Sequence, residues 1–244
     1  MKSIWKGAVQ LGLLIIPCKL YNVSTTKDNV KFHMMSNCCS SRVKLQKKCG
    51  SCNNEVTETK KGYPLSKDKI VIFDDEELKQ FEQNKSNIEI QSFISQEDID
   101  SLLFDDNYYV VPEELGLKPY SLLSNTLHDK YAFVQFIMHG KQRMGILRSV
   151  NNNLILTSLH YPHEMNPALD IKKLECSPTE IKLMNQIVKQ FSSPLDISTY
   201  TDTYKELIED LAKQKEQGIS ITNIQPTFTP KDDLVEALQK MLGG

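Results

Sequence analysis

The sequence predicts a mixed α+β protein in which a strand-rich body precedes a helical segment. Within residues 131–160, three apolar runs rich in branched and aromatic residues are separated by HGKQR and NNN, which are typical of turns, so we expect three antiparallel strands. From residue 177 onward the apolar residues recur at helical spacing instead. We place the boundary between the two parts after residue 173.

Further strands are expected before this meander. Residues 4–23 alternate and then become continuously apolar, which favours two strands joined near Gly12 and broken at Pro17. The other expected strands are residues 30–35, 69–73, 87–94 and 107–112, and the expected helices are residues 74–83, 98–106 and 119–130. In the last of these helices, Leu122, Leu123 and Leu127 are expected on one side.

Three amphipathic helices are expected in the C-terminal segment. Residues 177–180, SPTE, have the pattern of a cap, a first helical proline and a capping-box glutamate, and predict a helix ending near Phe191. The other two helices are expected at residues 201–217, with Gly218 as the stop, and 231–242. Their apolar faces need another surface, for which a second subunit is a candidate.

The net charge of −2 conceals a segregation of charge along the chain. Residues 1–61 carry 11 basic and 3 acidic side chains, and residues 130–173 carry 6 and 2. Residues 62–129 carry 5 basic and 15 acidic side chains, and residues 174–244 carry 7 and 11. Because affinity for nucleic acid depends on the local charge that faces the phosphates, the two basic segments can build a DNA or RNA surface. Uneven surface charge without a function gives the same pattern.

Four of the six cysteines are clustered in residues 33–52, which favours a metal site in a reducing compartment over a disulfide framework. The pair Cys49-x-x-Cys52 resembles a metal-binding turn, and soft ligands at this spacing favour a structural, tetrahedral Zn²⁺. Reduced, unligated thiols on a small hairpin are the alternative. Cys38, Cys39 or His33 can supply the second half of the site across the intervening hairpin. The expected ligand set is Cys39, Cys49 and Cys52, with His33 or Cys38 as the fourth.

No signature of a catalytic or membrane protein is found in the sequence. Gly-rich phosphate loops, GxSxG and HExxH are absent, which favours a binding protein over an enzyme. The carboxylates of residues 74–77 and 105–106 could form a two-metal or glycosidase pair, but a solvated acidic face is favoured. Because no apolar run approaches bilayer length and MKSIWKGAVQ lacks a secretory core, we expect a cytoplasmic protein with no membrane partner.

Short motifs are spread over nearly the whole chain. They are SIWKG at 3–7, GL at 12–13, IP at 16–17, KLY at 19–21, KGY at 61–63, DEEL at 75–78, IEI at 88–90 with Phe93, Phe104 with Tyr108 and Tyr109, GKxR at 140–143, LR at 147–148, LxY at 159–161, YxDxY at 200–204, KxxG at 215–218 and DLVEAL at 233–238. Together these motifs resemble the prokaryotic Ku family.

The resemblance implies a β-barrel core with an inserted bridge and a C-terminal helical arm that embraces a second copy. The homodimer would form a ring on double-stranded DNA ends, bridge and protect the break, and recruit an ATP-dependent DNA ligase in non-homologous end joining. Basic segments would face the lumen and contact the backbone without reading bases. The candidate DNA contacts are Lys6, Lys31, Arg42, Lys44, Lys47, Lys48, Lys130, Lys141, Arg143 and Arg148.

Two further expectations follow from the same comparison. The protein would be nucleoid-associated when bound to DNA. The chain ends at Gly243-Gly244 without the Lys-rich tail of longer family members, so we expect tail-driven DNA bridging to be weak or absent. A zinc-ribbon adaptor that docks on protein through its three helices is the competing hypothesis.

Overall fold

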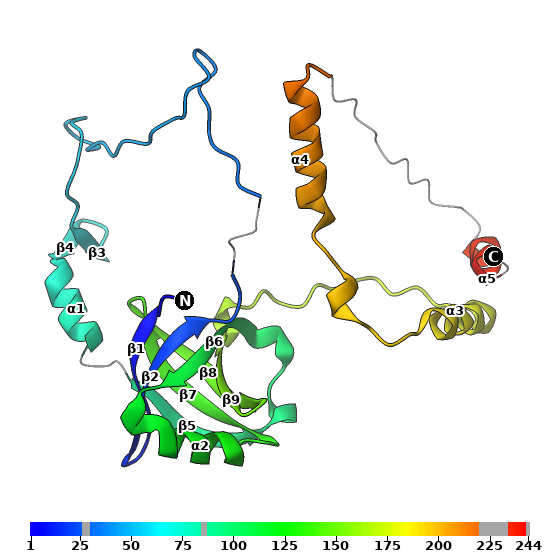
Figure 1. The fold of residues 1–244 in the computed structure, drawn as a ribbon, viewed down its shortest axis with the longest axis horizontal. Coiled ribbons are helices and arrows are strands. Elements are labelled where there is room, and N and C mark those ends of the chain that lie inside the picture. The colour runs from blue at the N-terminus through cyan, green and yellow to red at the C-terminus, as the bar shows by residue number, and fades with distance from the viewer. Residues whose placement is uncertain (26–29, 84–86, 220–233, 243–244) are drawn as a thin grey trace. The chain divides into compact units, whose positions relative to one another are not determined.

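The computed structural model describes residues 1–25, 30–83, 87–219 and 234–242 (Figure 1). The chain divides into two compact units, one comprising residues 1–28 and 33–167 and the other residues 29–32 and 168–244. The assignment of residues 1–173 to a DNA-binding core and of residues 174–244 to a dimerisation arm stays a prediction.

Within the described residues, seven strands close into a barrel in the order β1-β2-β6-β9-β8-β7-β5 (Figure 1). The strands are β1 (Trp5–Leu11), β2 (Leu14–Asn22), β5 (Asn87–Ser95), β6 (Phe104–Pro112), β7 (Lys130–Met138), β8 (Lys141–Val150) and β9 (Asn153–Leu159). Neighbouring strands pair antiparallel except β1 and β5, which are parallel. The expected mixed α+β class with a β-barrel is thus confirmed.

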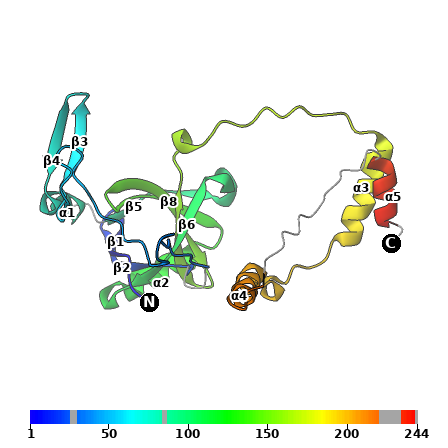
Figure 2. The ribbon, with the colours of Figure 1, turned by 90° about the horizontal axis from the view of Figure 1, so that it is seen from above.

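Helix α2 (Leu117–Thr126) lies against the barrel in both views (Figures 1 and 2). It contributes Tyr120 and Leu123 to the core, and Leu127 follows at its C-cap. The Tyr120 hydroxyl also accepts the buried N–H of Leu154 at 2.8 Å, so a backbone donor inside the barrel is satisfied. The expectation that Leu122 lies on one side of the helix with Leu123 and Leu127 is wrong, because those two are buried whereas Leu122 is 63% exposed.

The predicted meander is confirmed as β7, β8 and β9. Its turns consist of His139-Gly140 and Asn151-Asn152, and all four residues have positive φ, as two-residue hairpin turns of type I′ require. The first turn is therefore shorter than HGKQR suggested. Lys141 and Arg143, which HGKQR placed in the turn, belong to β8.

Pro17 does not break the second strand, contrary to expectation, but lies inside β2 opposite Ala8. Its carbonyl accepts the N–H of Glu113, and the N–H and C=O of one strand residue point to the same side. The missing proline donor therefore faces away from β1. Pro17 therefore costs no hydrogen bond to β1. On its other side, β2 pairs with β6 only from Cys18 onward, so Pro17 lies just before that pairing begins.

Two other local predictions were wrong. Residues 98–106 are not one helix but two 3₁₀ turns, η1 (Gln96–Asp98) and η2 (Ser101–Leu103), followed by β6. Asp98 accepts the N–H of Ser95 and Asp100 accepts that of Leu102, so these carboxylates are bound within the short turns. Residues 30–35 form no strand; only Met35 bridges to Arg42.

The segment between β2 and β5 contains a two-stranded ribbon, β3 (Lys61–Ser66) with β4 (Lys69–Phe73), and helix α1 (Asp75–Gln83). β4 and α1 match the sequence expectation, whereas β3 was missed because Gly62 and Pro64 are poor strand residues. Glycine suits position 62 because a side chain there would be crowded: a Cβ would come within 2.7 Å of the Ile70 side chain.

The second unit contains α3 (Pro178–Phe191), α4 (Thr203–Glu216) and α5 (Leu234–Leu242). The predicted capping box is present: Ser177 accepts the Glu180 N–H at 3.3 Å, and Glu180 accepts the Ser177 N–H at 2.6 Å. Helices α3 and α5 lie side by side and bury Ile187 and Leu238 (Figures 1 and 2). Residues 231–233 of the expected last helix lie outside the described residues. None of the helices in the described ranges is long and apolar enough to cross a membrane.

Gly145 in β8 provides a test of the barrel packing. A Cβ at this position would lie 2.7 Å from the Thr157 carbonyl oxygen and 3.2 Å from the Phe136 ring. Gly145→Ala is expected to lower the free energy of unfolding by about 1–3 kcal/mol, measured by urea denaturation. Gly50→Ala is the control, since a Cβ there meets nothing within 4 Å. Equal unfolding midpoints for the two variants would contradict the packing argument.

Candidate nucleic-acid interface

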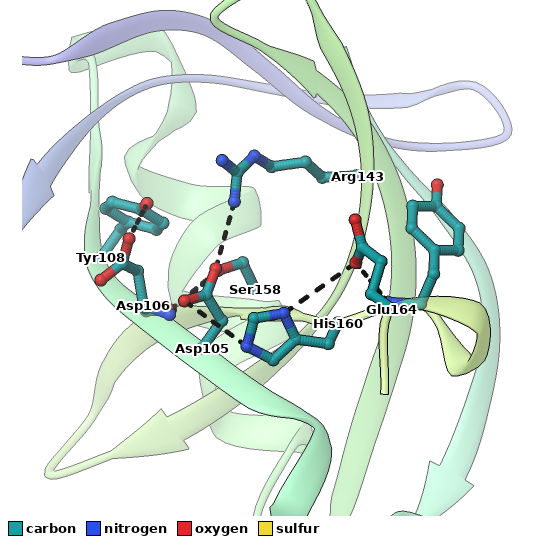
Figure 3. A network of polar contacts seen from close by, with 8 residues as sticks. Asp105, Asp106, Tyr108, Arg143, Ser158, His160 and Glu164 are labelled. Atoms are coloured by element: carbon teal, nitrogen blue, oxygen red, sulfur yellow. Dashed lines mark hydrogen bonds and ion pairs between the residues drawn. The ribbon is translucent and has the colours of Figure 1, made fainter. Parts of the chain in front are cut away.

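Arg143 is held by a carboxylate from a strand that is distant in sequence. Its Nη1 lies 3.2 Å from Oδ2 of Asp105 on β6, and the Ser158 hydroxyl donates to the same oxygen at 3.2 Å (Figure 3). The Nε of Arg143 is buried and has no hydrogen-bond partner among the described residues. Arg143 is thus a positioned, partly neutralised cation, and its buried Nε has no partner in the described part of the chain.

His160 lies between two carboxylates at the same end of the barrel (Figure 3). Its Nε2 is 3.9 Å from Asp105 Oδ1, and its Nδ1 is 3.9 Å from Glu164 Oε2. Glu164 is fixed in turn because it accepts the backbone N–H of Tyr161 at 2.8 Å. A pocket of about 180 Å³ opens here. It is lined by Asp105, Lys141, Gln142, Arg143, Leu159, His160, Tyr161 and Glu164.

Lys6 and Lys19 form a second cationic group on β1 and β2. They are cross-strand partners, and their ammonium groups lie 3.1 and 3.4 Å from Oε1 of Glu113. The hydrogen bond from Lys6 is the main cause that lowers the pKa of Glu113, so the carboxylate stays ionised between them. Two lysines share one carboxylate, which leaves this group net positive.

Arg148 on β8 belongs to the outer face of the barrel. Its Nη2 donates to the Asn107 amide oxygen at 3.2 Å, and that oxygen also accepts from the Thr157 hydroxyl at 2.7 Å. The Nε of Arg148 is buried, again with no partner in the described part of the chain. Because its recorded side-chain partner is a neutral amide, Arg148 is bound without charge compensation from that partner.

The cysteine-rich stretch consists of two turns with the same backbone pattern. In one, Ser36 N–H bonds to the Ser41 carbonyl and Ser40 N–H to the Ser36 carbonyl; in the other, Cys49 N–H bonds to the Asn54 carbonyl and Asn53 N–H to the Cys49 carbonyl. Ser36 therefore occupies the place of Cys49. By the same alignment, Cys39 occupies that of Cys52.

Two thiols in these turns, those of Cys39 and Cys49, have a lowered pKa. The Ser41 side chain is the main cause that lowers the pKa of Cys39, to about 7, and the Cys52 backbone lowers that of Cys49. Cys38 Sγ lies 2.8 Å from Ser36 Oγ. In the described ranges, however, no three His, Cys, Asp or Glu side chains are gathered in a metal-binding cluster. Zinc stays a prediction.

The structure distributes the candidate DNA contacts over several places. Lys6 and Arg148 are on the barrel strands, Lys141 and Arg143 line the pocket beside His160, and Lys130 donates to Ser95 at 3.1 Å. Arg42 contacts the ring of His33. Lys44, Lys47 and Lys48 are exposed between the two cysteine turns, and Lys31 belongs to the second unit.

Sequence reasoning missed Lys19 and the two carboxylates, Glu113 and Asp105, that bind the cations. The period-two alternation of β2 was a signal for Lys19, because Cys18 and Leu20 are core residues on either side of it. No local signal existed for the Arg143–Asp105 pair. Residues of the basic and acidic segments are thus paired with one another on the barrel, although their charges are segregated along the sequence.

A family model described as the Ku70/Ku80 beta-barrel domain matches residues 10–183, which include most of the barrel and the inserted ribbon. The barrel is therefore of the Ku70/Ku80 type. Over 98% of its length the chain is 34% identical to "Non-homologous end joining protein Ku" of Heliobacterium modesticaldum, covering 90% of that protein. It is 32% identical to the protein of the same name from Solibacter usitatus, over 97% of this chain and 91% of that one. The chain belongs to the Ku family, which confirms the resemblance of its motifs.

The Tyr108 hydroxyl allows a test of the buried side of this region. Burial raises the pKa of Tyr108 to about 12, and the nearby Asp106, which accepts its hydrogen bond at 3.2 Å, adds to the shift. Because its pKa is raised in the folded state, the contribution of the Tyr108 hydroxyl to stability is fully present below pH 10 and is lost as the pH rises toward 12. Between pH 8 and pH 11 the wild type should lose about 1.4 kcal/mol more than Tyr108→Phe, measured by urea unfolding. Exposed Tyr63→Phe is the control, and a wild-type loss no larger than that of Tyr108→Phe would refute the assignment.

Proposed function

We propose that this protein binds double-stranded DNA ends in non-homologous end joining. The observation that carries the proposal is membership in the Ku family, a DNA-binding family and not a known enzyme family. Relatives from Heliobacterium, Archaeoglobus and Bacillus subtilis, similar over nearly the whole chain, are named for this pathway. We infer that this protein is a cytoplasmic binding protein that associates with the nucleoid when bound to DNA. It would contact the sugar–phosphate backbone of DNA of any sequence.

The second part of the proposal is a homodimeric ring. Helix α3 leaves apolar side chains uncovered, each more than half exposed: Ile181, Met184, Val188 and Phe191. Such a stripe is expected to pack on another surface, and a second copy of the chain supplies one. A single-chain mass in sedimentation equilibrium would contradict the dimer. On the DNA end, the dimer would recruit an ATP-dependent DNA ligase. The ligase should then join DNA ends faster when the dimer is present.

A closed ring can load only where a duplex stops, so topology tests the function. Gel shifts should show binding to linear duplex and none to covalently closed circles of the same sequence. Affinity should fall with salt by about 0.9 log unit per phosphate contact per log unit of salt. Lys141→Glu should weaken binding to DNA of every sequence alike. Lys118→Glu on α2 is the matched control and should leave binding unchanged. Equal binding to linear and circular DNA would refute end recognition.

We also propose that Cys39, Cys49 and Cys52 hold a structural Zn²⁺, with Cys38 as fourth ligand in preference to His33. Cys38 is next to Ser36, which takes the place of a cysteine in the first turn, whereas the ring of His33 contacts Arg42. The two turns must come together for this site, and Zn²⁺ would supply the cross-link between them.

Metal analysis by mass spectrometry tests the zinc site directly. The purified wild type should contain about one zinc per chain, and Cys49→Ser/Cys52→Ser about none. Cys38→Ser should lose most of the metal and His33→Ala little. Cys176→Ser, which changes an exposed cysteine outside the turns, is the control. Metal-free wild-type protein purified without chelators would refute the proposal.

A further inference from the structure

Two tyrosines lie opposite each other on neighbouring strands, on the outer face of the barrel. Tyr21 on β2 and Tyr109 on β6 are direct cross-strand partners. The neighbouring pair, Leu20 and Val110, belongs to the core, so the alternation of the strands turns both tyrosines outward. Tyr109 is 38% exposed. The pair is held by the same register that closes the barrel.

The surface beside this pair is hollow and apolar. Met1, Tyr21, Tyr109 and Val111 line a shallow cavity of about 340 Å³, which is large enough for a planar ring to lie against the tyrosines. Val111 is the cross-strand partner of Lys19, so the apolar floor is continuous with a basic flank.

Cations border the aromatic pair on both sides. On one side Lys19 pairs across strands with Lys6, and the two share the single carboxylate of Glu113. On the other side the row continues from Tyr109 to Ile155 on β9 and from Ile155 to Arg148 on β8. Arg148 is bound to a neutral amide and its Nε is unpaired among the described residues. An apolar, aromatic strip with positive borders results.

This combination favours one kind of ligand. An apolar helix of a partner protein would bury the tyrosines but leave the cations on both borders unmatched. An unpaired nucleotide satisfies both, since its base stacks on an aromatic ring while its phosphate meets a cation. In a duplex the bases are stacked on one another inside the helix, so their faces are not accessible to a protein surface.

We propose that the Tyr21–Tyr109 face binds the unpaired nucleotides of single-stranded DNA. In the context of the proposed end-binding function, which this inference extends, such nucleotides are present at the overhang of a broken duplex. The tyrosines act as the stacking platform, and Lys19, Lys6 and Arg148 contact the phosphates. Binding is independent of base sequence, because every base has a π-face.

The test uses the full chain and a fluorescein-labelled oligothymidine of about 12 nucleotides, followed by fluorescence anisotropy. Tyr21→Ala and Tyr109→Ala should each weaken binding about five-fold or more. Tyr21→Phe and Tyr109→Phe should keep most of the affinity, since the ring and not the hydroxyl stacks. Tyr63→Ala removes an exposed tyrosine from β3 and is the control.

A blunt linear duplex, measured in parallel, separates this proposal from the proposed function. Wild-type binding to the blunt duplex without binding to oligothymidine would overturn the stacking site and leave end binding intact. Equal losses in the alanine and phenylalanine variants, or a loss as large for Tyr63→Ala, would also overturn it. The expected result is that the Tyr21→Ala/Tyr109→Ala double variant keeps its affinity for the blunt duplex and loses that for oligothymidine.

Discussion

The parallel contact between β1 and β5 is the constraint on which the rest of the barrel depends. It pairs Ala8, Val9 and Gln10 with Asn87, Ile88 and Glu89, across the whole inserted segment, and the Asn87 side chain donates to that of Gln10 at 2.8 Å. Without it β1 and β5 would be open edges, and an open edge invites pairing with other chains. Closure leaves no edge and fixes which residues face outward on every strand. The surface cations therefore have defined places, although their side chains are long.

The acidic middle of the chain has a local role on the barrel. Asp105 and Glu113 come from this acidic segment, yet they bind Arg143 and the Lys6–Lys19 pair. Ion pairs of this exposure contribute about 0–1 kcal/mol, so a phosphate can replace the carboxylate at small cost. Until it does, the carboxylates hold the cations in one orientation. A low net charge is thus compatible with the proposed nucleic-acid binding, because these carboxylates neutralise the cations only in part.

The predictions that held were those with local causes. The meander, β4, α1 and the capped helix α3 follow from alternation, turn residues and the Ser177–Glu180 box. Two of the failures have non-local causes: β3 is held by its pairing with β4 despite Gly62 and Pro64, and Pro17 is tolerated because its missing donor faces away from β1. The interface shows the same division. Its cations other than Lys19 were named from the sequence. The partner of Arg143, however, depends on the strand order β6-β9-β8, which a local pattern does not contain.

The barrel core also determines what its outside can bind. Leu20 and Val110 are buried, so a slip of one residue in β2 or β6 would expose them and turn Tyr21 or Tyr109 inward. The cost of exposing such core residues, about 1.5–3 kcal/mol each, therefore protects the register of the outer row as well. Side chains on paired strands lose little freedom when a ligand binds, so more of the contact energy remains as affinity. In this barrel, core residues thereby fix the geometry of the outer residues that we propose as ligand contacts.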